Sequence, residues 1–171
     1  MGRIYAVSHC ILNTFSKTLH DMSEDYIAEE NARRDFLEKV QKEGAMLIQL
    51  PCPEFLMYGG ERWGHSRSQF DNPFYRESCR KILAPFVMQL EEYSRMGGFS
   101  IEIVGIDGSP SCGVARSFDA ESYGGEMSRE GFGQRLQGGF LAEKPGVFME
   151  VLSSMLTEKD MDITFKTLRE L

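Results

Sequence analysis

Short apolar runs alternate along the chain with longer stretches in which apolar residues recur every three or four positions. The short runs are typical of buried strands, and the longer stretches are typical of amphipathic helices. The runs predict strands at Arg3–Ser8, Ala45–Leu50, Phe99–Ile106 and Asp162–Leu168. The periodic stretches predict helices at Asp21–Gly44, Asn72–Gly98 and Gly146–Thr157. Strands separated by helical crossovers predict a parallel sheet wrapped by helices, and we expect one α/β domain over residues 1–171.

Proline and glycine positions refine these boundaries. Asn72 followed by Pro73 is a typical helix start, whereas Pro85 inside the same stretch predicts a kink or two abutting helices. Residues 51–68 contain three glycines and show no period, so we expect a loop there. Residues 107–113 are rich in Gly, Ser and Pro and predict a turn, and residues 114–139 give no clear pattern.

Charge and hydropathy then exclude several classes of function. The 171 residues carry 19 Lys and Arg against 26 Asp and Glu, a formal charge of −7. Nucleic acid is therefore not expected as the main partner, because binding a polyanion requires basic surface. The longest apolar stretches fall far short of the roughly 20 residues of a membrane-spanning helix. The first residues do not resemble a signal peptide, so we expect a cytoplasmic protein with no membrane contact.

Three of the four cysteines follow predicted strands. Cys10, Cys52 and Cys112 come shortly after the first, second and third strand, whereas Cys79 lies on the apolar stripe of a helix. The carboxyl ends of parallel strands meet at one edge of a sheet, which is where ligands bind in such folds. Disulfides are rare in a reducing compartment, so the three cysteines are expected to converge as metal ligands, while Cys79 is expected in the core.

Three thiolates at one point repel each other unless a cation lies between them. Zinc usually takes four ligands, and His9 or His65 is a candidate for the fourth. An iron–sulfur cluster also accepts thiolates, and with only three of them one iron stays open to bind a substrate. The ligands are dispersed and no CxxC motif is present, so spacing alone leaves both alternatives open.

The segments that carry these cysteines resemble a known family. The chain reads S-H-C-I-L at residues 8–12, C-P-E at residues 52–54 and G-S-P-S-C-G at residues 108–113. In this order they resemble the three signature segments of the thiouracil-desulfidase-like family. After the first cysteine that family usually continues with Gly and a stretch similar to Arg-Tyr-Asp-Gly, which this chain lacks. The chain therefore resembles a divergent subgroup.

The resemblance implies a Rossmann-like three-layer domain and a four-iron, four-sulfur cluster held by Cys10, Cys52 and Cys112. It also implies that sulfur is removed from a thiocarbonyl nucleobase such as thiouracil, without net electron transfer. Motif matching makes Glu54 and Ser109 the catalytic acid/base pair. Ser111 and Trp63 are candidate substrate-binding residues, Trp63 because its ring can stack on a flat heterocycle.

The first hypothesis is thus an iron–sulfur-dependent desulfidase that acts on a small thiolated compound and releases sulfide. A zinc-dependent hydrolase with the same three thiolates is an alternative, as is a non-catalytic cluster or sulfur carrier. Exposed clusters are sensitive to oxygen, so aerobic handling is expected to leave zinc or an empty site. The sequence does not distinguish a monomer from a dimer.

Overall fold

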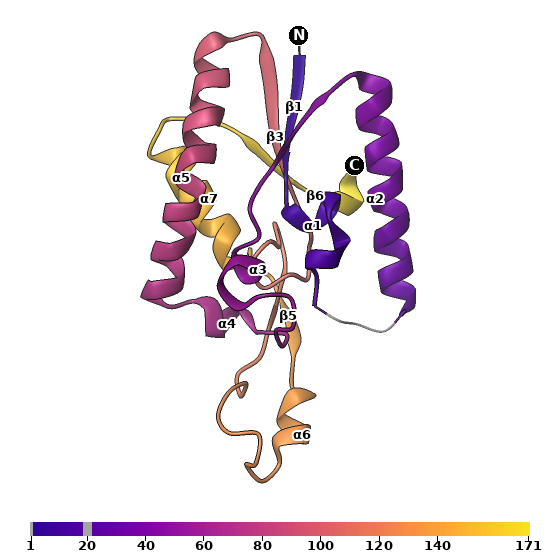
Figure 1. Ribbon diagram of the computed structural model, residues 1–171, viewed down its shortest axis with the longest axis vertical. Coiled ribbons are helices and arrows are strands. Elements are labelled where there is room, and N and C mark those ends of the chain that lie inside the picture. Colours follow the sequence, from indigo (N-terminus) through magenta and orange to yellow (C-terminus); the bar gives the residue numbers. More distant parts are fainter. Residues whose placement is uncertain (1, 19–21) are drawn as a thin grey trace.

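A four-stranded parallel sheet forms the centre of the molecule (Figure 1). The computed structural model describes residues 2–18 and 22–171. The sheet contains β1 (Gly2–Val7), β2 (Met46–Gln49), β3 (Phe99–Gly105) and β6 (Thr164–Thr167). The strand order is β2-β1-β3-β6, and every neighbouring pair is parallel. All four strands predicted from the sequence are present, and the expected α/β fold class with a parallel sheet is confirmed.

Three long helices cover the two faces of this sheet. They are α2 (Glu24–Glu43), α5 (Pro73–Met96) and α7 (Val147–Thr157). The path from β1 to β2 runs in one direction across the sheet, and the path from β2 to β3 runs back past β1. Right-handed crossovers then place the intervening helices on opposite faces. Accordingly α5 and α7 pack together on one face and α2 packs on the other (Figure 1).

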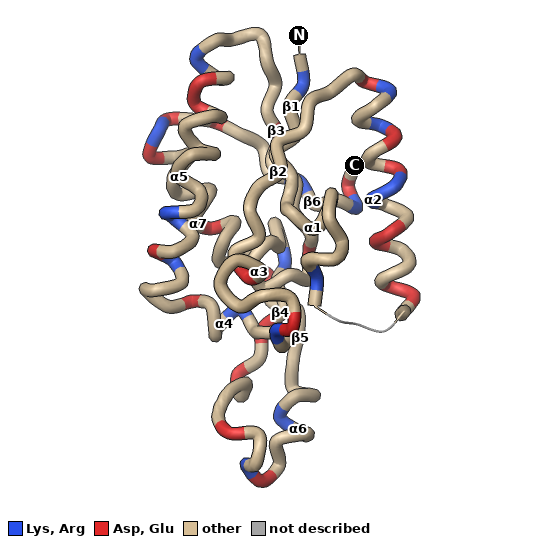
Figure 2. The backbone as a smooth tube through the Cα atoms, viewed as in Figure 1, with Lys and Arg blue, Asp and Glu red and all other residues tan. Residues whose placement is uncertain are grey.

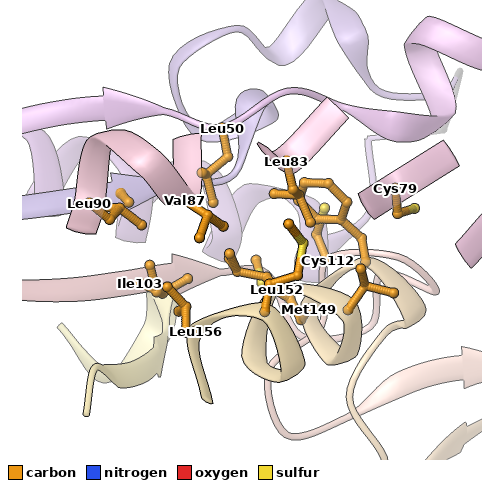
Figure 3. Close-up of a cluster of buried hydrophobic side chains, with 14 of the residues drawn as sticks. Leu50, Cys79, Leu83, Val87, Leu90, Ile103, Cys112, Met149, Leu152 and Leu156 are labelled. Atoms are coloured by element: carbon orange, nitrogen blue, oxygen red, sulfur yellow. The ribbon is translucent and has the colours of Figure 1, made fainter. Parts of the chain in front are cut away.

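Alternating residues of β1 divide the core into two layers. Ile4 and Ala6 face the layer built with α5 and α7, whereas Tyr5 and Val7 face the layer built with α2. Successive side chains of a strand point to opposite faces, so a strand buried on both faces contributes alternate residues to the two layers. Figure 3 shows the larger layer, where side chains from α5 and α7 meet over β3. Its labelled members include Leu83, Val87 and Leu90 of α5, Leu152 and Leu156 of α7, and Ile103 of β3.

The helix boundaries follow from capping residues. The Ser23 side chain accepts a hydrogen bond from the Tyr26 amide at the start of α2, and Gly44 ends the helix in the left-handed conformation with φ 62°. The predicted start at Asp21 lies outside the described residues. Asn72 caps α5 through the Tyr75 amide, as its position before Pro73 predicts. The chain stays one helix through Pro85, so the expectation of two abutting helices there is wrong.

The loop predicted over residues 51–68 is a second correction, because it contains α3 (Pro53–Tyr58) and the start of α4 (Arg67–Phe70). Pro53 occupies the first turn of α3, where a missing N–H costs nothing and the fixed φ favours the helix. Gly59, with φ 77°, ends α3 after six residues. The glycines that suggested a loop thus terminate a short helix that Pro53 begins.

Smaller elements fill the connections. Besides α3 and α4, the structure contains α1 (His9–Leu12), β4 (Ser117–Asp119), α6 (Phe132–Leu136), β5 (Phe140–Ala142) and two 3-10 helices, η1 (Thr14–Ser16) and η2 (Leu168–Glu170). Strands β4 and β5 form an antiparallel pair. Together with α6 they form an arm, residues 117–142, that projects past one end of the sheet (Figure 1).

Charged residues lie mainly on the helices and on the arm. Figure 2 shows basic and acidic residues interspersed along α2 and α5. Among the described residues, no helix is both long enough and apolar enough to cross a membrane.

Candidate active site

The three cysteines that follow strands line one cavity. Cys10 lies on α1 just after β1, Cys52 lies between β2 and α3, and Cys112 lies in the loop after β3. The cavity has a volume of about 360 Å³ and is found at the carboxyl ends of these strands. This is the edge at which open α/β sheets bind ligands, at the point where the strand order changes direction. All three thiols are free of disulfide bonds.

The turn at Cys52 orients its side chain. Cys52 is the N-cap of α3, and its sulfur accepts a hydrogen bond of 3.4 Å from the Phe55 amide. Pro51 and Pro53 restrict the backbone on either side. As the cap residue, Cys52 lies outside the helix, so its sulfur reaches the cavity while Glu54 stands in the first turn of α3.

The loop that carries Cys112 is held closely by the surrounding backbone. The Cys112 amide donates to the Ser109 hydroxyl at 3.0 Å, and the Cys112 carbonyl accepts from the Ile106 amide at 3.0 Å. A Cβ atom added at Gly146 would lie 2.4 Å from the Ser111 carbonyl group, and one added at Gly105 would lie 2.4 Å from the Cys112 oxygen. Glycine at both positions allows the backbone of the Cys112 loop to lie directly against β3 and the start of α7.

Asp107 supports the same loop from its far side. Its Oδ1 atom accepts hydrogen bonds from the amides of three successive residues, at 2.9, 3.0 and 3.3 Å. These residues are Val114, Ala115 and Arg116. Backbone donors in a turn need acceptors outside helices and strands, and one carboxylate oxygen accepts from three of them here.

Glu54 is the carboxylate at the centre of the cavity wall. It is buried, and its two oxygens have different partners. The Ser111 hydroxyl donates to Oε1 at 2.5 Å, and Nε of Arg62 donates to Oε2 at 3.3 Å. The Ser109 hydroxyl lies 3.3 Å from that of Ser111. The structure therefore brings Glu54, Ser109 and Ser111 together beside the three cysteines, with Ser111 rather than Ser109 touching Glu54.

Burial raises the pKa of all three cavity thiols. The pKa of Cys10 rises to about 12, that of Cys112 rises well above its usual value, and that of Cys52 is also raised. Neighbouring cysteines raise the pKa of Cys10 and Cys112 further, because three anions would repel each other in one cavity. Burial and mutual repulsion therefore both disfavour the thiolate form of these cysteines.

The opposite wall of the cavity comes from residues that the sequence did not single out. Lys17 forms an ion pair with Glu29 of α2, and its ammonium lies 5.5 Å from the centre of the Tyr26 ring. Burial lowers the pKa of Lys17. Arg62 also lines the cavity. No spacing rule connects these residues to the cysteines, because the contacts arise from how α2 and the loops pack in three dimensions.

Other candidates lie elsewhere. Trp63 does not belong to the cavity wall, and its side chain is 73% exposed. His9 stacks against Phe55, and His65 lies between aromatic rings; neither lines the cavity. Cys79 is fully buried in the core, as its place on the helix stripe predicts. The structure thus offers neither histidine beside the three thiols.

The spacing of the possible ligands distinguishes a single metal ion from a cluster. Within residues 2–18 and 22–171, no three His, Cys, Asp or Glu side chains lie close enough together to hold a single metal ion. Thiolates that share a cluster bind different irons, so they stand farther apart than the ligands of one ion. Three free thiols around one cavity fit a cluster in this respect.

Comparison with known proteins covers the same segments. The sequence profile of the family described as "Putative 2-thiouracil desulfurase" matches residues 2–132, a range that contains all three cysteine segments. The chain belongs to this family. An uncharacterized protein from Methanocaldococcus jannaschii is 29% identical over 169 residues, which cover 99% of this chain and 96% of the relative. No solved structure gives a significant match.

Membership in the desulfurase family agrees with the resemblance noted in the sequence. The profile ends at residue 132, whereas the relative from Methanocaldococcus jannaschii aligns over nearly the whole chain, including α7 and β6. The family description is that of an enzyme acting on a small sulfur-containing molecule.

Proposed function

We propose that this protein removes the sulfur atom of a small thiocarbonyl compound of the thiouracil type and releases it as sulfide. The observation that carries the proposal is the shared cavity, which Cys10, Cys52 and Cys112 line together with Glu54. In the overall reaction water adds to the thiocarbonyl carbon, the carbon–sulfur bond breaks, and a carbonyl and hydrogen sulfide result. Electrons balance without an oxidant or reductant.

Cys10, Cys52 and Cys112 are the residues that would hold a four-iron, four-sulfur cluster. When bound, the cluster would supply a Lewis-acidic iron that prefers a soft sulfur ligand to oxygen. Binding it must displace the thiol protons, because metals bind the thiolate form. The raised pKa of the three thiols favours their protonated form when no cluster is bound.

Glu54 is the proposed proton carrier. Its carboxylate can accept a proton from the attacking water and return it to the ring nitrogen or to the departing sulfur. The Ser111 hydroxyl and Arg62 hold one oxygen each, so the carboxylate has a fixed orientation in the cavity. Ser109 closes the Cys112 loop and is near enough to Ser111 to extend this hydrogen-bonded chain.

The test of this function starts with protein purified without oxygen, in which iron, acid-labile sulfide and zinc are measured before turnover of 2-thiouracil. We expect iron and sulfide in the parent, and sulfide release from the substrate. Zinc in place of iron would support the hydrolase alternative, and iron without turnover of any thiocarbonyl compound would support a carrier.

Glu54→Gln is expected to keep its iron, because the ligands are untouched, and to lose turnover by about 10²–10⁴-fold, the usual weight of one positioned proton carrier. Glu61→Gln is the matched control, since Glu61 is an exposed carboxylate nearby that does not line the cavity. Parental turnover in the iron-loaded Glu54→Gln variant would reject the assigned role. Loss of iron in that variant would make Glu54 a structural residue.

Cysteine substitutions test the ligand set independently of activity. Cys112→Ser is expected to lose most of its iron, whereas Cys79→Ser is expected to retain it, because Cys79 lies in the core away from the cavity wall. Iron content measured per chain decides the matter. Equal iron in both variants would contradict the shared-ligand proposal.

A further inference from the structure

Arg62 makes hydrogen bonds to three acceptors, two on α3 and one on η1. Its Nε donates to Oε2 of Glu54 on α3 at 3.3 Å. Its Nη1 donates to the Gly59 carbonyl, at the end of α3, at 3.0 Å. Its Nη2 donates to the Ser16 carbonyl of η1 at 2.8 Å. One side chain therefore joins both ends of the helix that carries Glu54 to the segment that follows Cys10.

The guanidinium is almost completely buried. The side chain of Arg62 is 4% exposed and that of its partner Glu54 is 10% exposed. Removing such a charge from water costs several kcal/mol unless the geometry of its partners is good. The planar fork of arginine meets this requirement here, because three nitrogens each reach a different oxygen. Packing alone does not explain why the guanidinium of Arg62, in the loop after α3, is buried.

The segment that Arg62 holds is joined to α2 by the ion pair between Lys17 and Glu29, and its backbone amides bond within the segment. The amides of Ser16 and Lys17 donate to the carbonyls of Asn13 and Thr14, and the Ser16 hydroxyl also donates to Asn13. Phe15 points into solvent with 95% of its surface exposed. A three-residue 3-10 helix has little stability of its own. The bond from Arg62 therefore secures one wall of the cavity, the wall that carries Lys17.

We propose that Arg62 is a positioning residue that locks the segment after Cys10 onto α3 and holds the Glu54 carboxylate in place. The guanidinium contacts no cysteine by a hydrogen bond in the structure, so this role is separate from holding a metal group. The part that concerns Glu54 rests on the proposed function, whereas the part that concerns the segment does not.

Two substitutions separate these roles. Arg62→Met keeps most of the aliphatic length and removes the guanidinium. Arg62→Lys keeps the charge, but a single ammonium cannot reproduce the fork that spans three acceptors. Arg80→Met is the matched control, because Arg80 also pairs with a glutamate, through two bonds of 2.9 Å to Glu158, on an exposed surface away from the cavity.

Hydrogen exchange of the Ser16 and Lys17 amides, measured on the anaerobically purified protein, tests the lock directly. We expect at least about tenfold faster exchange in both Arg62 variants and no change in Arg80→Met, because local opening governs exchange. Equal exchange in the parent and Arg62→Met would overturn the proposal. If Arg62→Met fails to fold, Arg62→Lys provides the same comparison.

Turnover of 2-thiouracil tests the effect on Glu54. Arg62→Met is expected to lower kcat by about 10–100-fold, the cost of a small misplacement of a reacting group, with KM and iron content little changed. Arg62→Lys is expected to recover part of kcat while its exchange stays fast. Loss of iron from Arg62→Met would overturn the positioning role. An inactive parent would reject the proposed function, and the exchange comparison would still decide the role of Arg62.

Discussion

Two serines of the S-P-S-C-G segment have different partners although only one residue separates them. Ser111 is buried and donates to Glu54, whereas Ser109 accepts from the Cys112 amide and closes the turn. Motif matching assigns Ser109 to acid/base chemistry, and Ser111 is a candidate substrate-binding residue. The contacts connect Ser111 to the proton carrier directly and connect Ser109 to it through Ser111.

Cys79 allows a test of burial at the scale of one thiol. Burial raises its pKa from 9.0 to about 12, so the folded protein favours the neutral thiol. Between these two values the unfolded chain releases the proton and the folded chain retains it. The stability from the neutral thiol is therefore present below about pH 9 and is lost as pH rises towards 12.

Cys79→Ala is accordingly expected to be less stable than the parent by about 1–3 kcal/mol at neutral pH, from lost packing. The difference in the free energy of unfolding should become smaller at about pH 11. At that pH the parent is less stable because its thiol ionises more easily in the unfolded chain, and the variant has no such thiol. Urea unfolding at both pH values measures it. A difference that stays constant with pH would show that the Cys79 thiol does not titrate differently on unfolding.

At the scale of elements, the backbone contact between α7 and the Cys112 loop is too close to admit a side chain at Gly146. The Gly146 amide donates to the Gly113 carbonyl at 2.9 Å, and the Gly146 Cα faces the Ser111 peptide with no room for a side chain. The N-terminus of α7 thus sets the position of Cys112.

Gly146→Ala is expected to cost about 1–3 kcal/mol of stability, because backbone must move to admit the methyl group. It is also expected to lower iron content by displacing Cys112. Gly133→Ala in α6 is the control, since a Cβ there meets nothing within 4 Å. Urea unfolding and iron analysis of both variants check this. Parental iron and stability in Gly146→Ala would show that the loop can move away without cost.

The same elements show what the sequence can predict. Strands and long helices were found because each displays an apolar face with its own period, as the alternation of Ile4 and Tyr5 between two layers illustrates. Short helices such as α3 have too few residues to display a period, so the sequence predicts a loop where Pro53 begins a helix. The convergence of three cysteines followed from parallel topology. The contacts of Arg62 and Lys17 did not, because they depend on loop packing that no repeat encodes.

For the whole molecule, the arm at residues 117–142 is attached to the body at its base. The Ser68 amide and hydroxyl both donate to Asp119 at 2.9 Å. Farther out, α6 has no buried residue. The tip of the arm therefore adds little to the core.

Replacing residues 123–137 by two glycines is expected to change the free energy of unfolding by less than about 1 kcal/mol. The ends of the deleted segment are close, since a Cβ on Gly138 would lie 3.8 Å from the Ser122 hydroxyl. Urea unfolding of the shortened chain measures the effect. A loss of several kcal/mol would mean that the tip supports the sheet.

The strand order also has a consequence for biosynthesis. β1 is made first, yet it pairs with both β2 and β3, and the three cysteines stand after these three strands. A nascent chain that has left the ribosome only as far as β2 presents two of the thiols, and the third arrives when β3 has been made and has docked against β1. The three thiols therefore meet only in a chain whose strands β1, β2 and β3 have already paired, and a cofactor that binds all three finds its site only at that stage.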